Sequence, residues 1–389
     1  MKEYVIKGGS VYAENEVFSP GFVHITNGKI AAAGPLSACP SDVPSISTSA
    51  ESMILPGAVD IHIHGAAGAD TMDATQASLH KMAAYLPSEG TTTFLPTTMT
   101  QAKEAIEQAL NCFSHYEQKP GEAEIAGIHL EGPFISPKHP GAQPREAIQK
   151  PDVEQFQKWN TLSGEKVRLV TLAPEEKYGM DLVAYLTQSG VTASAGHTDA
   201  TFDELCRAAE AGLTHITHLY NGMRGMHHRE PGTAGGALLH SGLYVEMIVD
   251  GIHIHPQMVR LAFEQKTADR TILITDSMRA KGVPDGEYEL GGQAVTVQNG
   301  RAVLEDGTLA GSTLSMQGAI QNMRKFTDCT IRDIVKMTAE NPAKQVRLFE
   351  RKGSIAPGKD ADLVVYDGQF CVQKTICRGV VAFEKEREK

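Results

Sequence analysis

The sequence predicts an α/β protein, a (β/α)8 TIM-like barrel with a small β-sandwich domain formed by both chain termini. Short apolar segments alternate with helical stretches between about residue 58 and residue 275, and their number matches the strand–helix units of such a barrel. The two ends of the chain show strand and turn patterns without a helical period. An open doubly wound sheet is the alternative, but no GxGxxG fingerprint follows the first strand.

The predicted barrel strands are short and apolar, and each is followed by polar or glycine-containing residues: 58–64, Thr92–Pro96, Ile125–Leu130, Val167–Leu172, Val191–Ala195, His215–Leu219, Val245–Val249 and Ile272–Thr275. Helices are predicted between most of them, at Ala74–Glu89, Gln101–Tyr116, Met180–Ser189, Phe202–Ala211 and Pro256–Gln265. Turn dipeptides such as Asp285-Gly286 and Asn299-Gly300 predict a β-hairpin insertion near 285–309.

The domain boundaries follow from these patterns. Residues 1–55 and 357–389 are expected to build the small β domain together, and residues 56–356 the barrel. The Asn27-Gly28 pair is a strong hairpin signal in the first part. We expect the β domain to have a structural role.

Composition narrows the class of protein. The net charge of −11 argues against a general nucleic-acid binder, which would carry a basic face. The chain has neither an apolar run of membrane-spanning length nor a signal-peptide pattern at its start, so we expect a cytoplasmic protein without a membrane partner. Its 6 cysteines lack CxxC spacing, which indicates reduced thiols rather than a zinc knuckle.

Histidine and carboxylate residues gather at the predicted carboxyl ends of the barrel strands, where such folds carry their reactive groups. His62 and His64 share one face of the first strand, because side chains alternate along a strand. The other strand ends supply Glu131, His197, His218 and Asp276. Each has an alternative role, as a turn carboxylate, a helix cap or a packed core histidine.

Taken together, these side chains indicate a metal site, because they would be costly to bury unpaired and a divalent cation would satisfy them. We expect one or two ions: one held by His62, His64 and Glu131, the other by Glu131, His197 and His218. Nitrogen and carboxylate ligands suit Zn²⁺, Fe²⁺, Mn²⁺ or Co²⁺ alike. Asp276 would shuttle protons.

Longer stretches around these positions resemble the amidohydrolase superfamily and, within it, the N-acetylglucosamine-6-phosphate deacetylase family. The resemblance covers almost the whole chain and rests on these segments: 56–65, 90–97, GIHLEGPF at 127–134, AGHTDA at 195–200, THLYNGM at 217–223, REPG at 229–232, VDGIH at 249–253 and LAGS at 309–312. The combination of HLEGP, GHT, HLYN and DGxH is not shared by the superfamily in general.

The resemblance implies a reaction and roles for residues. The reaction is hydrolysis of the N-acetyl group of N-acetylglucosamine 6-phosphate to glucosamine 6-phosphate and acetate, in amino-sugar catabolism and cell-wall sugar recycling. Glu131, His197 and His218 match core metal ligands, and Asp276 matches the catalytic acid/base. Residues expected to contact the phosphosugar are Ala142, Gln143, Asn221, Gly222, Arg229, Asp250, His253, Leu309, Ala310 and Gly311.

Two positions vary among members of the family. Some members have histidine where this chain has Gln143, and an amide can hydrogen-bond but cannot carry charge. Members that lack the His62 and His64 pair are expected to bind one metal, so this chain resembles the binuclear members. The resemblance also implies a homodimer, in which Arg229 or His253 could reach the partner's substrate.

Two other functions stay open at this point. One is a different amide hydrolase of the superfamily, such as a dihydroorotase-like enzyme, although such enzymes bridge their metals with a modified lysine and the candidate bridge here is Glu131. The other is a non-catalytic barrel that serves as a scaffold, which loss of ligands would mark.

Overall fold

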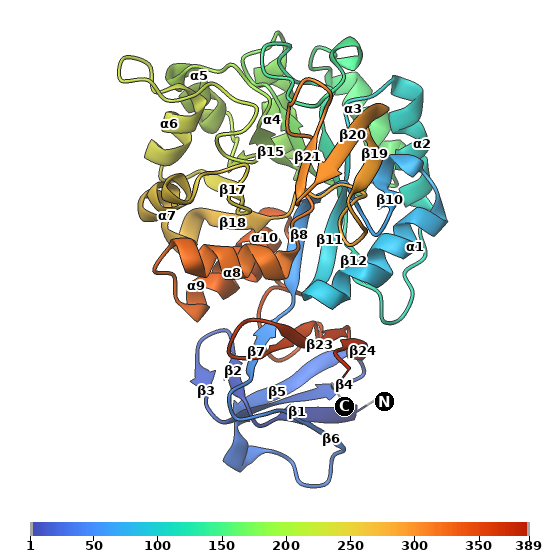
Figure 1. Ribbon diagram of the computed structural model, residues 1–389, viewed down its shortest axis with the longest axis vertical. Coiled ribbons are helices and arrows are strands. Elements are labelled where there is room, and N and C mark those ends of the chain that lie inside the picture. The colour runs from blue at the N-terminus through green and yellow to red at the C-terminus, as the bar shows by residue number, and fades with distance from the viewer. Residues whose placement is uncertain (1–2, 387–389) are drawn as a thin grey trace.

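The computed structural model describes residues 3–386, which form a barrel above two small sheets in the view of Figure 1. The parallel barrel strands follow the order of the chain: β8 (Ala58–Ile63), β11 (Thr91–Thr98), β13 (Ile128–Glu131), β14 (Val167–Leu172), β15 (Thr192–Ala195), β16 (His215–Ile216), β17 (Tyr244–Ile248) and β18 (Thr271–Ile274). The short strand β12 (Glu124–Ile125) pairs with the start of β11. The predicted (β/α)8 barrel is confirmed.

Backbone hydrogen bonds between the first and last strand segments close the barrel. The Asp276 amide donates to the His62 carbonyl at 2.9 Å, and the His64 amide donates to the Ser277 carbonyl at 2.9 Å. An open doubly wound sheet has two free edges, so these bonds exclude that alternative. They also bring Asp276 beside both histidines of the first strand.

One helix follows each barrel strand: α1 (Gln76–Tyr85), α2 (Lys103–Ser114), α3 (Val153–Leu162), α4 (Gly179–Ser189), α5 (Phe202–Glu210), α6 (Gly232–Leu239), α7 (Pro256–Arg270) and α8 (Met316–Phe326). Helices α9 (Ile331–Val335) and α10 (Asn341–Gln345) come next, joined by a π-helical turn. The five predicted helices are present with shifted ends. Helix α6 was not predicted because glycine disfavours helices. Glycine occurs here because α6 packs closely on α5, where a Cβ at Gly236 would lie only 2.8 Å from Leu205.

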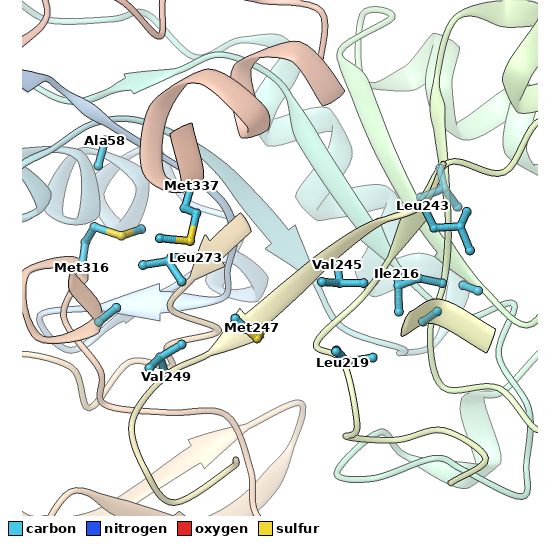
Figure 2. Close-up of a cluster of buried hydrophobic side chains, with 14 of the residues drawn as sticks. Ala58, Ile216, Leu219, Leu243, Val245, Met247, Val249, Leu273, Met316 and Met337 are labelled. Carbon is cyan, nitrogen blue, oxygen red and sulfur yellow. The ribbon is translucent and has the colours of Figure 1, made fainter. Parts of the chain in front are cut away.

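Two apolar layers hold the barrel together. The larger one lies between strands and helices, and Figure 2 shows part of it, with Val245 and Met247 of β17, Leu273 of β18 and Met316 of α8. Alternate residues of the strands build the second layer, in which Ile272 and Ile274 pack with residues of β11 and β14. Side chains of such distant strands can meet only inside a barrel.

The chain ends form two sheets that pack face to face, as predicted. One has the order β5–β4–β1–β6, built from Lys29–Pro35, Gly21–Thr26, Glu3–Lys7 and Ser45–Ser47. The other has the order β24–β23–β22–β7–β2–β3, built from Val380–Glu384, Val372–Cys377, Leu363–Tyr366, Met53–Pro56, Ser10–Tyr12 and Val17–Phe18. One apolar cluster unites residues of both sheets. The boundaries at residues 55 and 356 stay a prediction.

The insertion after β18 is a three-stranded antiparallel sheet rather than a simple hairpin. It consists of β19 (Gly286–Leu290), β20 (Gln293–Gln298) and β21 (Arg301–Val303). Leu290 is buried and packs with Met99, which follows barrel strand β11. Side-chain hydrogen bonds from Gln101 to the Gly291 carbonyl and from Gln293 to the Ala142 carbonyl fasten this sheet over the barrel mouth.

Candidate metal centre and substrate cavity

A β-bulge in the first barrel strand aims its histidines. From Asp60 to Ile63 the strand advances three residues, while the paired strand β11 advances only from Phe94 to Pro96. Bulges re-aim side chains and are frequent beside active sites. His62 and His64 both point their Nε2 atoms at Asp276 Oδ1, at 3.3 and 3.2 Å. The predicted shared face of the two histidines is thus present, at the end of a bulged strand.

Glu131 ends β13 and lies between two sets of nitrogen atoms. Its Oε1 atom is 3.3 Å from His197 Nε2 and 3.2 Å from His218 Nε2. The same oxygen is 3.3 Å from His62 Nε2, and Oε2 is 3.3 Å from His64 Nε2. These buried residues make two groups that could each hold a metal ion: His62, His64 and Asp276, and Glu131, His197 and His218.

Each of the four histidines is oriented through its other ring nitrogen. His64 Nδ1 lies 3.2 Å from the Thr97 carbonyl, His197 Nδ1 lies 3.0 Å from the His139 carbonyl, and His218 Nδ1 lies 3.1 Å from the Asn221 carbonyl. A carbonyl only accepts, so Nδ1 carries a proton and Nε2 is the nitrogen that can offer a lone pair to a metal ion once it is deprotonated. His62 Nδ1 similarly faces a carboxylate oxygen of Glu246 at 3.0 Å. This is the arrangement that orients histidine ligands of metals.

The geometry fits a bound cation. His197 Nε2 and His218 Nε2 are 3.1 Å apart, so two lone pairs face each other beside Glu131. His62 Nε2 is completely buried and makes no well-aligned hydrogen bond, although carboxylate oxygens of Glu131 and Asp276 lie 3.3 Å away. Buried polar atoms are costly without a partner, and a divalent cation would satisfy these nitrogens and the carboxylates at once. The residues can therefore hold metal, while their chemistry suits several transition metals equally.

The buried charges shift one another's pKa values. Burial alone would raise the pKa of Asp276, but His62 and His64 beside it hold that pKa below its ordinary value. Burial likewise would raise the pKa of Glu131, and the surrounding histidines hold it well below normal. Burial acts to lower the pKa of His64, yet Asp276 and Glu131 raise it to about 9. Both carboxyl groups are thus ionised near neutral pH.

The backbone is strained at three of the predicted site residues. His197, His218 and Asp276 adopt φ angles of 48°, 28° and 47°, in the left-handed region that non-glycine residues rarely occupy. Such strain costs about 1–3 kcal/mol per residue and clusters at functional sites, where the surrounding structure enforces it. The neighbouring Gly222 cannot be replaced without a clash, because a Cβ there would lie 2.9 Å from His197 Nδ1.

A cavity of about 220 Å³ opens above this cluster. Besides His64, Glu131, His197, His218 and Asp276, its lining includes most of the residues predicted to contact a substrate: Ala142, Gln143, Asn221, Gly222, His253, Leu309 and Gly311. Met99 and Leu290 complete an apolar part of the wall. Leu290 comes from the insertion and was not predicted to line the site.

The remaining predicted contact residues lie elsewhere. Ala310 is buried and packs against the insertion sheet rather than lining the cavity. Asp250 holds His253, whose Nδ1 lies 2.6 Å from its carboxylate. Arg229 stands on an exposed loop, where its Nη1 atom is 2.7 Å from His228 Nε2. A single chain therefore does not bring Arg229 to its own cavity.

Comparisons with known proteins place this barrel among hydrolases. A family model described as the amidohydrolase family matches residues 53–382. The chain belongs to the amidohydrolase family. This amidohydrolase is 50% identical over 385 residues to N-acetylglucosamine-6-phosphate deacetylase of Bacillus subtilis (strain 168), covering 97% of each chain. It is also 34% identical to N-acetylgalactosamine-6-phosphate deacetylase of Escherichia coli O157:H7, covering 97% of this chain and 99% of the relative.

Solved structures agree with these relatives. The N-acetylglucosamine-6-phosphate deacetylase of Thermotoga maritima superposes with a TM-score of 0.88 at 35% identity, over 98% of this amidohydrolase and 100% of that chain. A mutant of the Mycobacterium smegmatis enzyme in complex with N-acetyl-D-glucosamine-6-phosphate gives a TM-score of 0.91 at 30% identity and the same coverage. The resemblance recognised in the sequence is confirmed.

One buried residue of the amidohydrolase site escaped the sequence analysis. Glu246 of β17 faces His62 Nδ1 through Oε2, faces His215 Nε2 through Oε1 at 3.0 Å, and accepts the backbone N–H of His218 at 3.1 Å. It thus links the two candidate ligand groups. A glutamate in the middle of an apolar strand was the available signal, because an unpaired carboxylate is rarely buried.

Among the described residues of the amidohydrolase, no helix is long and apolar enough to cross a membrane.

Proposed function

We propose that this amidohydrolase removes the N-acetyl group of N-acetylglucosamine 6-phosphate, giving glucosamine 6-phosphate and acetate. The observation that carries the proposal is the buried cluster in which Glu131 lies between two groups of histidines at the floor of a cavity, next to the ionised Asp276. Two relatives that carry this activity in their names match 97% and 84% of the chain.

His62, His64 and Glu131 would hold one divalent ion, and Glu131, His197 and His218 the other. When bound, such ions activate water near neutral pH and polarise an amide carbonyl. The four imidazoles are fixed by their Nδ1 contacts, so their Nε2 atoms need little rearrangement to act as ligands. Zn, Fe, Mn and Co all remain compatible with this donor set.

Asp276 is proposed as the proton carrier of the reaction. Its carboxylate is ionised because His62 and His64 lower its pKa, and it lines the cavity. It would accept the proton of the attacking water and then deliver that proton to the amide nitrogen, so that the amine leaves uncharged. The closure bond between the Asp276 amide and the His62 carbonyl keeps the carboxylate at this point.

His253 and Arg229 are proposed to bind the 6-phosphate. His253 lines the cavity and is oriented by Asp250, whose pKa is lowered by that histidine against the effect of burial. Arg229 presents a planar fork that matches phosphate oxygens, but it lies on the exposed loop of its own chain. We therefore propose that Arg229 of one protomer reaches the cavity of its partner in a homodimer.

The surface around Arg229 supports this dimer. Met226 and Leu239 are 47% and 66% exposed, and they border a hollow that Leu238 and Leu261 line beside the histidines of the same loop. Large exposed apolar groups gathered at one place are typical of protein interfaces. Arg229 and most of the residues that line the hollow lie on one loop–helix segment, so a partner that covers the apolar patch would also be close to the arginine.

The test is deacetylation of N-acetylglucosamine with and without its 6-phosphate, alongside N-acetylgalactosamine 6-phosphate, with metal quantified in the same sample. We expect release of acetate from the phosphorylated glucosamine derivative at a much higher kcat/KM than from the free sugar. Equal rates on the phosphorylated and free sugars would contradict the phosphate assignment. Purified protein without any transition metal, and without activity after metal addition, would favour the scaffold alternative.

A dihydroorotase-like reaction is the weaker candidate. Enzymes of that type bridge two metals with a modified lysine, and no lysine is among the described residues that line this cavity. The buried Lys281 instead donates to Glu89 at 2.8 Å. The central position between the two histidine groups belongs to Glu131.

A further inference from the structure

Gln143 is almost completely buried and uses both ends of its amide. The backbone N–H of Thr100, just beyond β11, donates to Gln143 Oε1 at 2.7 Å. Gln143 Nε2 in turn donates to Glu131 Oε2 at 2.7 Å. The backbone N–H can only donate, so it fixes which end of the amide is oxygen. The NH₂ group must therefore face Glu131.

The hydrogen bond from Gln143 distinguishes the two oxygens of Glu131. Oε1 faces the Nε2 atoms of His62, His197 and His218 and receives nothing from Gln143. Oε2 faces His64 Nε2 at 3.3 Å and also accepts from Gln143. A carboxylate oxygen has two lone-pair directions, so Oε2 can accept this N–H and still offer a lone pair to a cation.

We propose that Gln143 is a positioning residue that holds the Glu131 carboxylate in the orientation in which it would serve as a metal ligand beside both groups of histidines. The resemblance to the family instead implied contact between Gln143 and the substrate. A glutamine performs the positioning without adding positive charge beside a cation site, which a protonated histidine would do. This inference rests on the metal-dependent function proposed above.

The sharpest test is Gln143→Glu. This variant keeps an oxygen for the Thr100 N–H, so the backbone stays satisfied, but it replaces the N–H donor by an oxygen facing Glu131 Oε2. We expect metal affinity to fall about 10–100-fold, the range typical when a partner that orients a metal ligand is lost. Affinity is measured by competition with a coloured chelator, using Zn²⁺ and Co²⁺ and no substrate, and ions per chain are counted by elemental analysis.

Two further variants separate positioning from folding. Gln143→Leu removes the donor without adding charge, so it should also weaken metal binding. Gln293→Leu breaks the neighbouring hydrogen bond to the Ala142 carbonyl and leaves Glu131 untouched, so its metal affinity should match that of the unmodified protein. The thermal unfolding midpoint of each metal-free variant shows whether it folds.

The kinetic constants complete the test. For a positioning residue, kcat should fall in the Gln143 variants while KM for the phosphosugar stays within about twofold once metal is saturating. Unchanged metal affinity with a raised KM would overturn the proposal and favour direct substrate contact. Failure of the deacetylation assay on the unmodified protein would contradict the proposed function alone, since metal affinity is measured without substrate.

Discussion

The position of the Asp276 carboxylate is set by the backbone of this residue. Its amide is bonded across the barrel seam, its φ is positive, and its carboxylate meets His62 and His64. Asp276→Asn should therefore leave the fold and the arrangement of Glu131, His197 and His218 unchanged, but it removes the proton carrier. We expect kcat to drop about 10²–10⁴-fold, while an ion held by Glu131, His197 and His218 should be retained. Near-normal turnover in steady-state assays would show that the role is misassigned.

At the residue scale, the sequence located the candidate ligands better than the residues that support them. His62, His64, Glu131, His197, His218 and Asp276 were predicted because barrel strands end at known places and polar residues there are conspicuous. The contacts of Glu246 with His62 and of Gln143 with Glu131 join segments that are not neighbours in the chain. Periodicity in one strand cannot show which side chain of another strand will face it.

Among the elements, the insertion sheet contributes Leu290 to the cavity wall. Leu290 at the end of β19 is 2% exposed and packs on Met99 and Met278. Leu290→Ala should lower the free energy of unfolding by about 2–5 kcal/mol, because a cavity replaces the side chain. The measurement is urea unfolding. Val17→Ala, at a half-exposed site on β3, is the control and should change stability by less than about 0.5 kcal/mol.

The positions of the strands could be predicted because apolar runs alternate with helices in the sequence. The ends of some strands could not be predicted. The strand predicted at 215–219 leaves the sheet after Ile216, where the backbone turns into positive φ at His218 and Tyr220 and brings His218 to the site. The strand predicted at 125–130 is divided between β12 and β13. In both places the requirements of the site or of packing override local β propensity.

At the scale of the whole molecule, an ionic cluster joins the barrel to the β domain. Arg351 donates to both oxygens of Glu124, at 2.6 and 3.0 Å, and also to Asp360. Lys352 is buried between Glu124 and Asp362. Burial would raise the pKa of Glu124, but Arg351 and Lys352 lower it to about 2.

This lowered pKa predicts acid sensitivity. A carboxylate whose pKa is depressed by folding stabilises the protein above its unfolded pKa, near 4.5, and loses that stabilisation as the pH falls towards 2. Glu124→Gln should cost up to about 3 kcal/mol at pH 7, and the difference from the unmodified protein should shrink below pH 4.5. Thermal unfolding across pH 3–7 measures it. Parallel curves for the two proteins would argue against the linkage.

The proposed dimer predicts complementation between two impaired chains. Arg229→Ala should raise KM for the phosphosugar about 10-fold or more, because a charged hydrogen bond to phosphate is lost. Mixing this variant with Asp276→Asn under conditions that exchange subunits should restore activity, since one cavity of the hybrid would have an intact Asp276 and the partner's intact arginine. No recovery, despite exchange seen by native mass spectrometry, would place Arg229 outside the partner's site.

Strand β7 continues into β8 with only Gly57 between them, and β7 pairs with β22 near the end of the chain. During synthesis on a ribosome, His62 and His64 therefore emerge long before the segments that secure their strand. The barrel seam needs Asp276 and Ser277, and the sheet that anchors β7 needs Leu363–Tyr366. The first candidate ligands to be translated are therefore among the last to be fixed by their partner strands, and we expect the complete site to form only after the chain has left the ribosome.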